Sequence, residues 1–153
     1  MEQHRLLRSR LGESKPPEAR FAGLERSGEI PCILYAAKST EDKRGSIPDQ
    51  LRECRAAIER ESGRAVVAEY TDVAVSAFSR SRGPGLVEAM QHAEELSQDG
   101  SIELWAQHSD RLARGDGVSA RHAVEVALWA LKRYVTVRTV QDPDTFRDSF
   151  TRL

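Results

Sequence analysis

Apolar residues follow two alternating patterns along this chain. Short apolar runs between polar stretches are typical of buried strands, and repeats at three- and four-residue spacing are typical of helices. Strand-like runs at 32–37, 65–70, 102–107 and 135–140 alternate with helical repeats at 47–62, 86–98 and 118–134. This order predicts an α/β domain of three layers, in which a mainly parallel sheet of four to five strands lies between helices.

Capping residues support the first predicted helix. Ser46, with Asp49 three residues later, forms a capping-box pattern, and Pro48 suits the first helical turn. Gly63 is a common kind of helix stop. In the last predicted helix, the periodicity predicts five residues that face the core: Ala123, Val126, Ala127, Ala130 and Leu131.

The two ends of the chain differ from its middle. Residues 1–30 are rich in Arg and Glu and contain a Pro-Pro pair, which predicts a disordered extension, either a solvated tail or an arm that touches DNA. We expect one folded domain at 31–145. The segment 146–153 is expected to be a truncated C-terminal end.

Composition narrows the classes of function. The net charge of the 153-residue chain is -1, so any contact with nucleic acid must come from a local cluster of charge. Cys32 and Cys54 have no metal-type neighbours, and the four histidines are scattered, so we expect neither a metal nor a cofactor. No apolar run is long enough to span a membrane and no signal peptide is evident, which predicts a cytoplasmic protein.

The first apolar run leads directly into Lys38 and Ser39. Ligands of open α/β sheets gather outside the carboxyl ends of the strands. A hydroxyl at this position is a candidate nucleophile or phosphate contact. The alternative is that Ser39 merely belongs to a polar loop.

A second polar cluster follows the third predicted strand. Asp110, Arg111 and Arg114 crowd its carboxyl end, and the two arginines are three residues apart, so on a helical turn they point the same way. Two guanidinium groups can hold a phosphate through paired hydrogen bonds. The alternative is a solvated turn in which Asp110 forms a salt bridge.

Together these stretches resemble the catalytic domain of serine recombinases, the family of resolvases, invertases and large serine integrases. The resemblance covers about residues 31–142. Its motifs are Tyr35-x-x-x-Ser39, Ser46-x-x-x-Gln50, Asp72 to Ala77 with Gly83-Pro84-Gly85-Leu86, and Asp110-Arg111-Leu112-Ala113-Arg114.

In that family a serine attacks a DNA phosphodiester, which leaves a 5′-phosphoserine link and a free 3′ hydroxyl. The resemblance implies that Ser39 is the nucleophile, that Arg111 and Arg114 hold the scissile phosphate, and that Asp110 orients them. It also implies a set of further contacts with the DNA substrate: Tyr35, Lys38, Gln50 and Arg82. DNA is the implied partner, together with a second copy of the chain or an intact recombinase.

The chain departs from the family pattern at three points. Ala37 replaces an arginine usual two residues before the serine, and Gly83, next to Arg82, replaces another before the Pro-Gly-Leu turn. The chain stops at Leu153, before the family's long dimerisation helix and DNA-binding domain. Two alternatives to a recombinase stay open: an inactive remnant or accessory module, and a flavodoxin-like domain that binds phosphate.

Overall fold

The computed structural model describes residues 28–38, 45–73, 83–112 and 119–147. Strands and helices alternate through these ranges, as the apolar pattern predicted. Their bounds are β1 (Ile30–Lys38), α3 (Ile47–Glu61), β2 (Arg64–Val73), α4 (Pro84–Ser97), β3 (Glu103–Ala106), the 3-10 turn η1 (Ser109–Arg111), α5 (Ser119–Arg133) and β4 (Thr136–Thr139).

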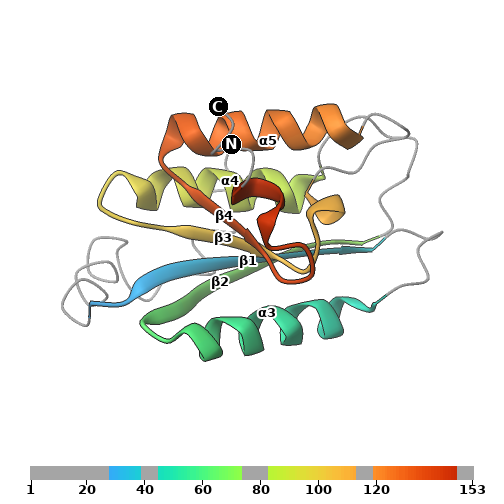
Figure 1. Cartoon of the computed structure of the whole chain (residues 1–153), viewed down its shortest axis with the longest axis horizontal. Helices are drawn as coiled ribbons and strands as arrows, with labels where there is room; N and C mark the ends of the chain where they lie inside the picture. Colours follow the sequence, from blue (N-terminus) through green and yellow to red (C-terminus); the bar gives the residue numbers. More distant parts are fainter. Residues whose placement is uncertain (1–27, 39–44, 74–82, 113–118, 148–153) are drawn as a thin grey trace.

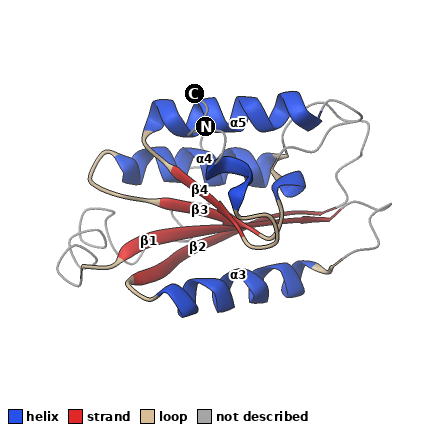
Figure 2. Cartoon of the chain, viewed as in Figure 1, coloured by secondary structure: helices blue, strands red, loops and turns tan. Residues whose placement is uncertain are grey.

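The four strands form one parallel sheet in the order β2-β1-β3-β4. Helix α3 covers one face, and α4 and α5 cover the other, so the domain has three layers (Figures 1 and 2). The predicted α/β class with a parallel sheet is therefore confirmed. The sheet has four strands within the described ranges, at the lower end of the predicted number.

Strand β1 supplies both hydrophobic cores because successive side chains of a strand point to opposite faces. Cys32 and Leu34 pack in a small core with Cys54 and Ile58 of α3. The larger core lies on the other face. It contains Ile33, Tyr35 and Ala37 of β1, Leu86, Ala89, Met90 and Ala93 of α4, and Val126, Ala127 and Ala130 of α5.

Helix α3 begins and ends as the sequence predicted. The Ser46 hydroxyl accepts a hydrogen bond from the Asp49 N–H at 3.2 Å, which satisfies a donor of the first turn. At the other end, Ser62 and Gly63 both have positive φ angles, of 55° and 68°. Glycine adopts this left-handed conformation without strain, so the chain can turn there into β2.

Three sequence predictions differ from the structure. Strand β2 extends three residues past the predicted end at 70, because its polar end is stabilised by contacts at the start of α4, described below. Leu131, predicted to face the core, is half exposed, since α5 buries only the side that contains Val126, Ala127 and Ala130. Phe146 lies just past the expected domain boundary and is nevertheless buried in the larger core.

A buried carboxylate ties three strands together near the start of β3. Glu103 accepts hydrogen bonds from the Arg64 guanidinium at 2.9 and 3.0 Å, from Trp105 Nε1 at 2.8 Å and from Arg138 at 3.3 Å. Burial acts to raise the pKa of Glu103, but these donors outweigh it and hold the pKa below its ordinary value. This ion-pair network lies at the first residue of β3, at the opposite end of the strand from the polar edge considered next, so we assign it a structural role.

Within the described ranges, none of the helices is long and apolar enough to cross a membrane.

Candidate active site

The carboxyl ends of the parallel strands meet at one edge of the sheet, and polar residues gather there. Lys38 ends β1, and Asp72 is the second-last residue of β2. Gln107 and the turn η1 follow β3, and Asp142 follows β4 closely. Ligand sites of parallel α/β sheets lie at this edge.

On its β3 side, the end of β1 is held by a side chain and not by a neighbouring strand. On the β3 side, pairing of β1 stops at Tyr35, whereas on the β2 side it continues to Lys38. The Gln50 amide takes over, since its Oε1 accepts from Ala37 N–H at 3.1 Å and its Nε2 donates to Ala37 C=O at 2.9 Å. Gln50 is fully buried. Its amide thus replaces a strand partner at the point where β1 leads to the candidate nucleophile.

Gln50 also holds the far end of the segment that contains Ser39. Its Nε2 donates to the Gly45 carbonyl at 3.2 Å. One buried amide therefore fixes Ala37 and Gly45, the residues that flank 38–44. Gly45 has a φ of +55°, so a residue with a side chain would be strained at this position.

The end of β2 is clamped to the start of α4 by Asp72. Its carboxylate accepts hydrogen bonds from the Gly85 N–H at 2.8 Å, the Leu86 N–H at 3.0 Å and the Tyr35 hydroxyl at 2.7 Å. Negative charge at a helix N-terminus is stabilising. A Cβ on Gly83 would lie 2.4 Å from the Asp72 carboxylate, so the close approach requires glycine there.

The turn η1 places the first arginine of the predicted phosphate site. His108 caps this turn, because its Nδ1 accepts from the Asp110 N–H at 3.1 Å. Arg111 is only 4% exposed, and its Nε lies 3.9 Å from Oδ1 of Asp110. Since a buried guanidinium is costly unless it is paired, this carboxylate helps to keep the arginine in place.

Asp142 supports the same turn from the end of β4. Its Oδ1 accepts from the Ser109 N–H at 3.1 Å, and its Oδ2 accepts from the Thr145 hydroxyl at 2.8 Å. The Nε2 of His108 lies 3.7 Å from Oδ2. Burial acts to raise the pKa of Asp142, but the donors lower it below its ordinary value, so the group is anionic near neutral pH.

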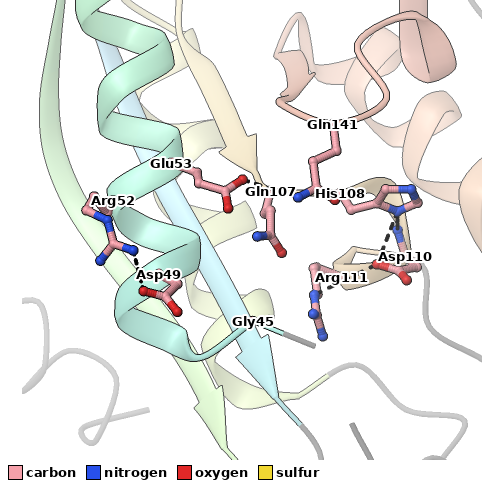
Figure 3. Close-up of a pocket in the computed structure, with 9 residues that line it drawn as sticks. All are labelled: Gly45, Asp49, Arg52, Glu53, Gln107, His108, Asp110, Arg111 and Gln141. Atoms are coloured by element: carbon pink, nitrogen blue, oxygen red, sulfur yellow. Dashed lines mark hydrogen bonds and ion pairs between the residues drawn. The ribbon is translucent and has the colours of Figure 1, made fainter. Parts of the chain in front are cut away.

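These elements enclose a polar cavity of about 300 Å³ (Figure 3). Arg111 and Asp110 line one side of it, and residues from the first turns of α3 line the other. Asp49 and Arg52 form an ion pair with each other at its margin. The full lining is Gly45, Asp49, Arg52, Glu53, Gln107, His108, Asp110, Arg111 and Gln141.

The predicted site residues fall into four groups. Asp110 and Arg111 line the cavity together. Tyr35 and Gln50 are buried, and their polar atoms contact Asp72 and backbone groups, as given above. Lys38 is the last residue of β1, and the remaining three predicted residues lie outside the described ranges: Ser39, Arg82 and Arg114.

Sequence reasoning missed two residues that organise this edge, Asp72 and His108. Asp72 had a weak signal, because it is a carboxylate at the end of one strand and negative charge is favourable at the start of the next helix, which the later Gly83-Pro84-Gly85 turn marks. The signal of His108 was its place two residues before Asp110. His108 is far in the sequence from the other histidines, so a search for metal-ligand spacing does not find it.

The buried guanidinium of Arg111 gives the sheet edge a fixed positive charge. Such a group can bind a phosphate oxygen and stabilise charge that develops on it. Among the residues that the structure describes, no group of three or more His, Cys, Asp or Glu side chains could hold a metal ion.

Comparison with known proteins agrees with this picture. A model of the resolvase N-terminal domain family matches residues 32–153. The fold is similar to the crystal structure of the C-terminal catalytic domain of ISC1926 TnpA, an IS607-like serine recombinase, with a TM-score of 0.57 and 19% sequence identity over 80% of this chain and 78% of that one. A search of curated proteins found no match. On the family match, which spans most of its length, the chain belongs to the resolvase N-terminal domain family.

Proposed function

We propose that this site-specific recombinase domain cleaves and rejoins DNA with the Ser39 hydroxyl as nucleophile. The observation that carries the proposal is a buried arginine, Arg111, fixed at the sheet edge where β1 leads into Ser39. Gln50 holds both flanks of the Ser39 segment, and His108 caps the turn that contains Arg111. In this proposal, adjacent strand ends would supply the nucleophile and the phosphate-binding cation.

The reaction exchanges one phosphodiester bond for another. The Ser39 oxygen loses its proton and forms a bond to phosphorus, while the bond from phosphorus to the 3′ oxygen breaks and that oxygen leaves as a hydroxyl. The product is a 5′-phosphoserine link. A 3′ hydroxyl of the recombining strand then attacks the same phosphorus and releases serine, so no cofactor or external energy is needed.

Arginines take the part that a general base plays in other serine enzymes. A serine hydroxyl is a weak nucleophile at neutral pH. Arg111, together with Arg114, would bind the non-bridging oxygens and stabilise the negative charge of the transition state. Asp110 would orient Arg111, since its carboxylate lies 3.9 Å from the Nε atom.

The other predicted substrate residues divide by their contacts. Lys38 and Arg82 are proposed to contact DNA phosphates directly. For Tyr35 and Gln50 we propose positioning roles, because Tyr35 donates to Asp72 and Gln50 binds the backbone of Ala37 and Gly45. DNA as substrate also agrees with the cytoplasmic location expected from the sequence.

One observation favours a second candidate, an accessory domain that pairs with an intact recombinase. Two arginines usual in serine recombinases are replaced by Ala37 and Gly83. Ala37 is completely buried, and a side chain on Gly83 would collide with Asp72. The described fold therefore accommodates the loss of both cations at these positions.

Trapping of protein-linked DNA distinguishes the two candidates. The chain is joined to a DNA-binding module and given a nicked substrate, and covalent adducts are counted for the wild type, Ser39→Ala and Arg111→Ala. Catalysis predicts no adduct with Ser39→Ala and a rate about 10²- to 10³-fold lower with Arg111→Ala. Arg55→Ala is the matched control, because Arg55 is an exposed arginine paired with Glu69 away from the site. Absence of an adduct from a folded, DNA-bound wild type would favour the accessory candidate.

A further inference from the structure

His108 contacts the turn η1 with one of its ring nitrogens. The Nδ1 atom lies 3.1 Å from the backbone nitrogen of Asp110 and 3.2 Å from its Oδ1, so both the N–H and the carboxylate of Asp110 face this nitrogen (Figure 3). A neutral ring accepts from the N–H, and a protonated ring donates to the carboxylate. Either bond holds the residue that directly precedes Arg111.

The other ring nitrogen of His108 faces Asp142. The Nε2 atom lies 3.7 Å from Oδ2 of that carboxylate. An anionic oxygen at this distance stabilises a proton on Nε2, which in the neutral ring leaves Nδ1 as the acceptor. The second oxygen, Oδ1, accepts from the Ser109 N–H at 3.1 Å. Asp142 therefore acts on the turn twice, through His108 and through Ser109.

Asp142 is itself fixed by the segment around the end of β4. The Thr139 hydroxyl donates to the Asp142 carbonyl at 2.8 Å, and the Thr145 hydroxyl donates to Oδ2 at 2.8 Å. The N–H of Gln141 donates to the Gln107 carbonyl at 2.9 Å, which joins the segment after β4 to the segment after β3. A continuous set of contacts thus runs from the end of β4 to the turn η1.

We propose that His108 and Asp142 are positioning residues for Arg111 in DNA cleavage. Arg111 is buried, and its Nε lies 3.9 Å from Oδ1 of Asp110, the residue that His108 holds. A shift of the turn would move the guanidinium with it, and misplacement of a reacting group by about 1 Å can cost about 10²-fold in rate. This inference rests on the proposed function, because it gives the two residues a part in the same reaction.

Single-turnover cleavage of a nicked substrate by the chain joined to a DNA-binding module tests the proposal. The rate is measured at saturating DNA, and the affinity for DNA is measured separately. His108→Ala should cleave about 10- to 100-fold more slowly at unchanged affinity, because Arg111 is present but misplaced. His108→Asn should stay within about threefold of the wild type, since asparagine keeps a polar atom in the place of Nδ1 and is a favoured cap residue. His108→Gln reaches toward Asp142 but lacks that atom, so it should be as slow as His108→Ala.

His92→Ala is the matched control. His92 also bonds through Nδ1, to the Tyr70 hydroxyl at 2.9 Å, but it is not among the residues that line the cavity, so its replacement should leave the cleavage rate unchanged. Asp142→Ala should slow cleavage as well. The double variant with His108→Ala should lose less than the product of the two single losses, because both residues act on one turn. Urea denaturation confirms that each variant is folded under the assay conditions.

The Arg111 Nε–H signal in ¹⁵N NMR spectra reports how firmly the guanidinium is held, without DNA. Arg111→Ala identifies the signal by its loss. Exchange of this proton with solvent should be about tenfold faster in His108→Ala and unchanged in His108→Asn and His92→Ala. A wild type that forms no Ser39-dependent adduct would contradict the proposed function, whereas the exchange rates still test whether His108 holds Arg111. Unchanged exchange in His108→Ala, or cleavage by it at the wild-type rate, would overturn the positioning role.

Discussion

Replacing Gln50 with leucine should destabilise the domain and slow DNA cleavage together. The two side chains are similar in size, but leucine has no polar atoms. The change leaves the N–H and C=O of Ala37, which is completely buried, without the partners they have at 3.1 and 2.9 Å. It also removes the 3.2 Å bond to the Gly45 carbonyl.

The magnitude follows from the number of buried groups left without partners. Each costs about 1–3 kcal/mol, so the two groups of Ala37 together cost about 2–6 kcal/mol. The apolar leucine side chain recovers about 1–2 kcal/mol through burial. The difference of these ranges is a net loss of about 0–5 kcal/mol in the free energy of unfolding, with a central value of about 2–3 kcal/mol. This is a large part of the total of about 5–15 kcal/mol typical of a domain.

Urea denaturation measures the stability change, and the covalent DNA adduct measures the rate under conditions where the variant is fully folded. Glu59→Leu is the matched control, because Glu59 is an exposed residue on the same helix and its replacement should change stability by no more than about 0.5 kcal/mol. If Gln50→Leu unfolds at the same urea concentration as the control, the amide does not hold the end of β1. If it is destabilised but cleaves DNA at the wild-type rate, the proposed positioning role of Gln50 is wrong.

Three further predictions concern groups away from Gln50. Tyr35→Phe removes one hydrogen bond to Asp72 and should cost about 1 kcal/mol of stability. Asp72→Ala should cost about 3 kcal/mol or more, because the carboxylate accepts three hydrogen bonds. Equal losses of the two variants in urea denaturation would contradict this. The pKa of Glu103 is lowered in the folded state, so this carboxylate stabilises the fold above pH 4.5. The contribution is lost as the pH falls through the folded-state pKa. Glu103→Gln should therefore make the free energy of unfolding less sensitive to acid. Burial raises the pKa of Cys32 and Cys54 to about 12, so both thiols of the native protein should resist alkylation at about pH 8. Mass spectrometry measures the alkylation. Rapid modification of the native protein would refute this prediction.

Local sequence signals predicted the framework of this domain. The apolar run at 32–37 identified β1, and Ser46 identified the start of α3, because both depend on residues that are neighbours in the chain. Asp110 and Arg111 were predicted at the cavity for the same reason, as they directly follow a strand. Leu131 was misplaced because periodicity defines a helix face but not how wide a part of it the domain covers.

Contacts between distant segments could not be predicted. Gln50 was predicted as a contact with the DNA substrate, and the contacts of its amide with Ala37 were not foreseen. They arise because β3 ends before β1 does, which leaves the β3 side of that backbone without a strand partner. The length of β3 relative to β1 is a property of the assembled sheet. Likewise, the contact of Tyr35 with Asp72 depends on the register of β1 against β2.

Mass spectrometry of the trapped DNA adduct identifies the nucleophile itself. The adduct is digested with nuclease and protease, and the residue that retains the 5′ phosphate is identified. Thr40 and Ser46 are the neighbouring hydroxyls against which the assignment is made. The proposed mechanism predicts phosphate on Ser39 alone. Phosphate on another residue, or a DNA link that persists in Ser39→Ala, would contradict it.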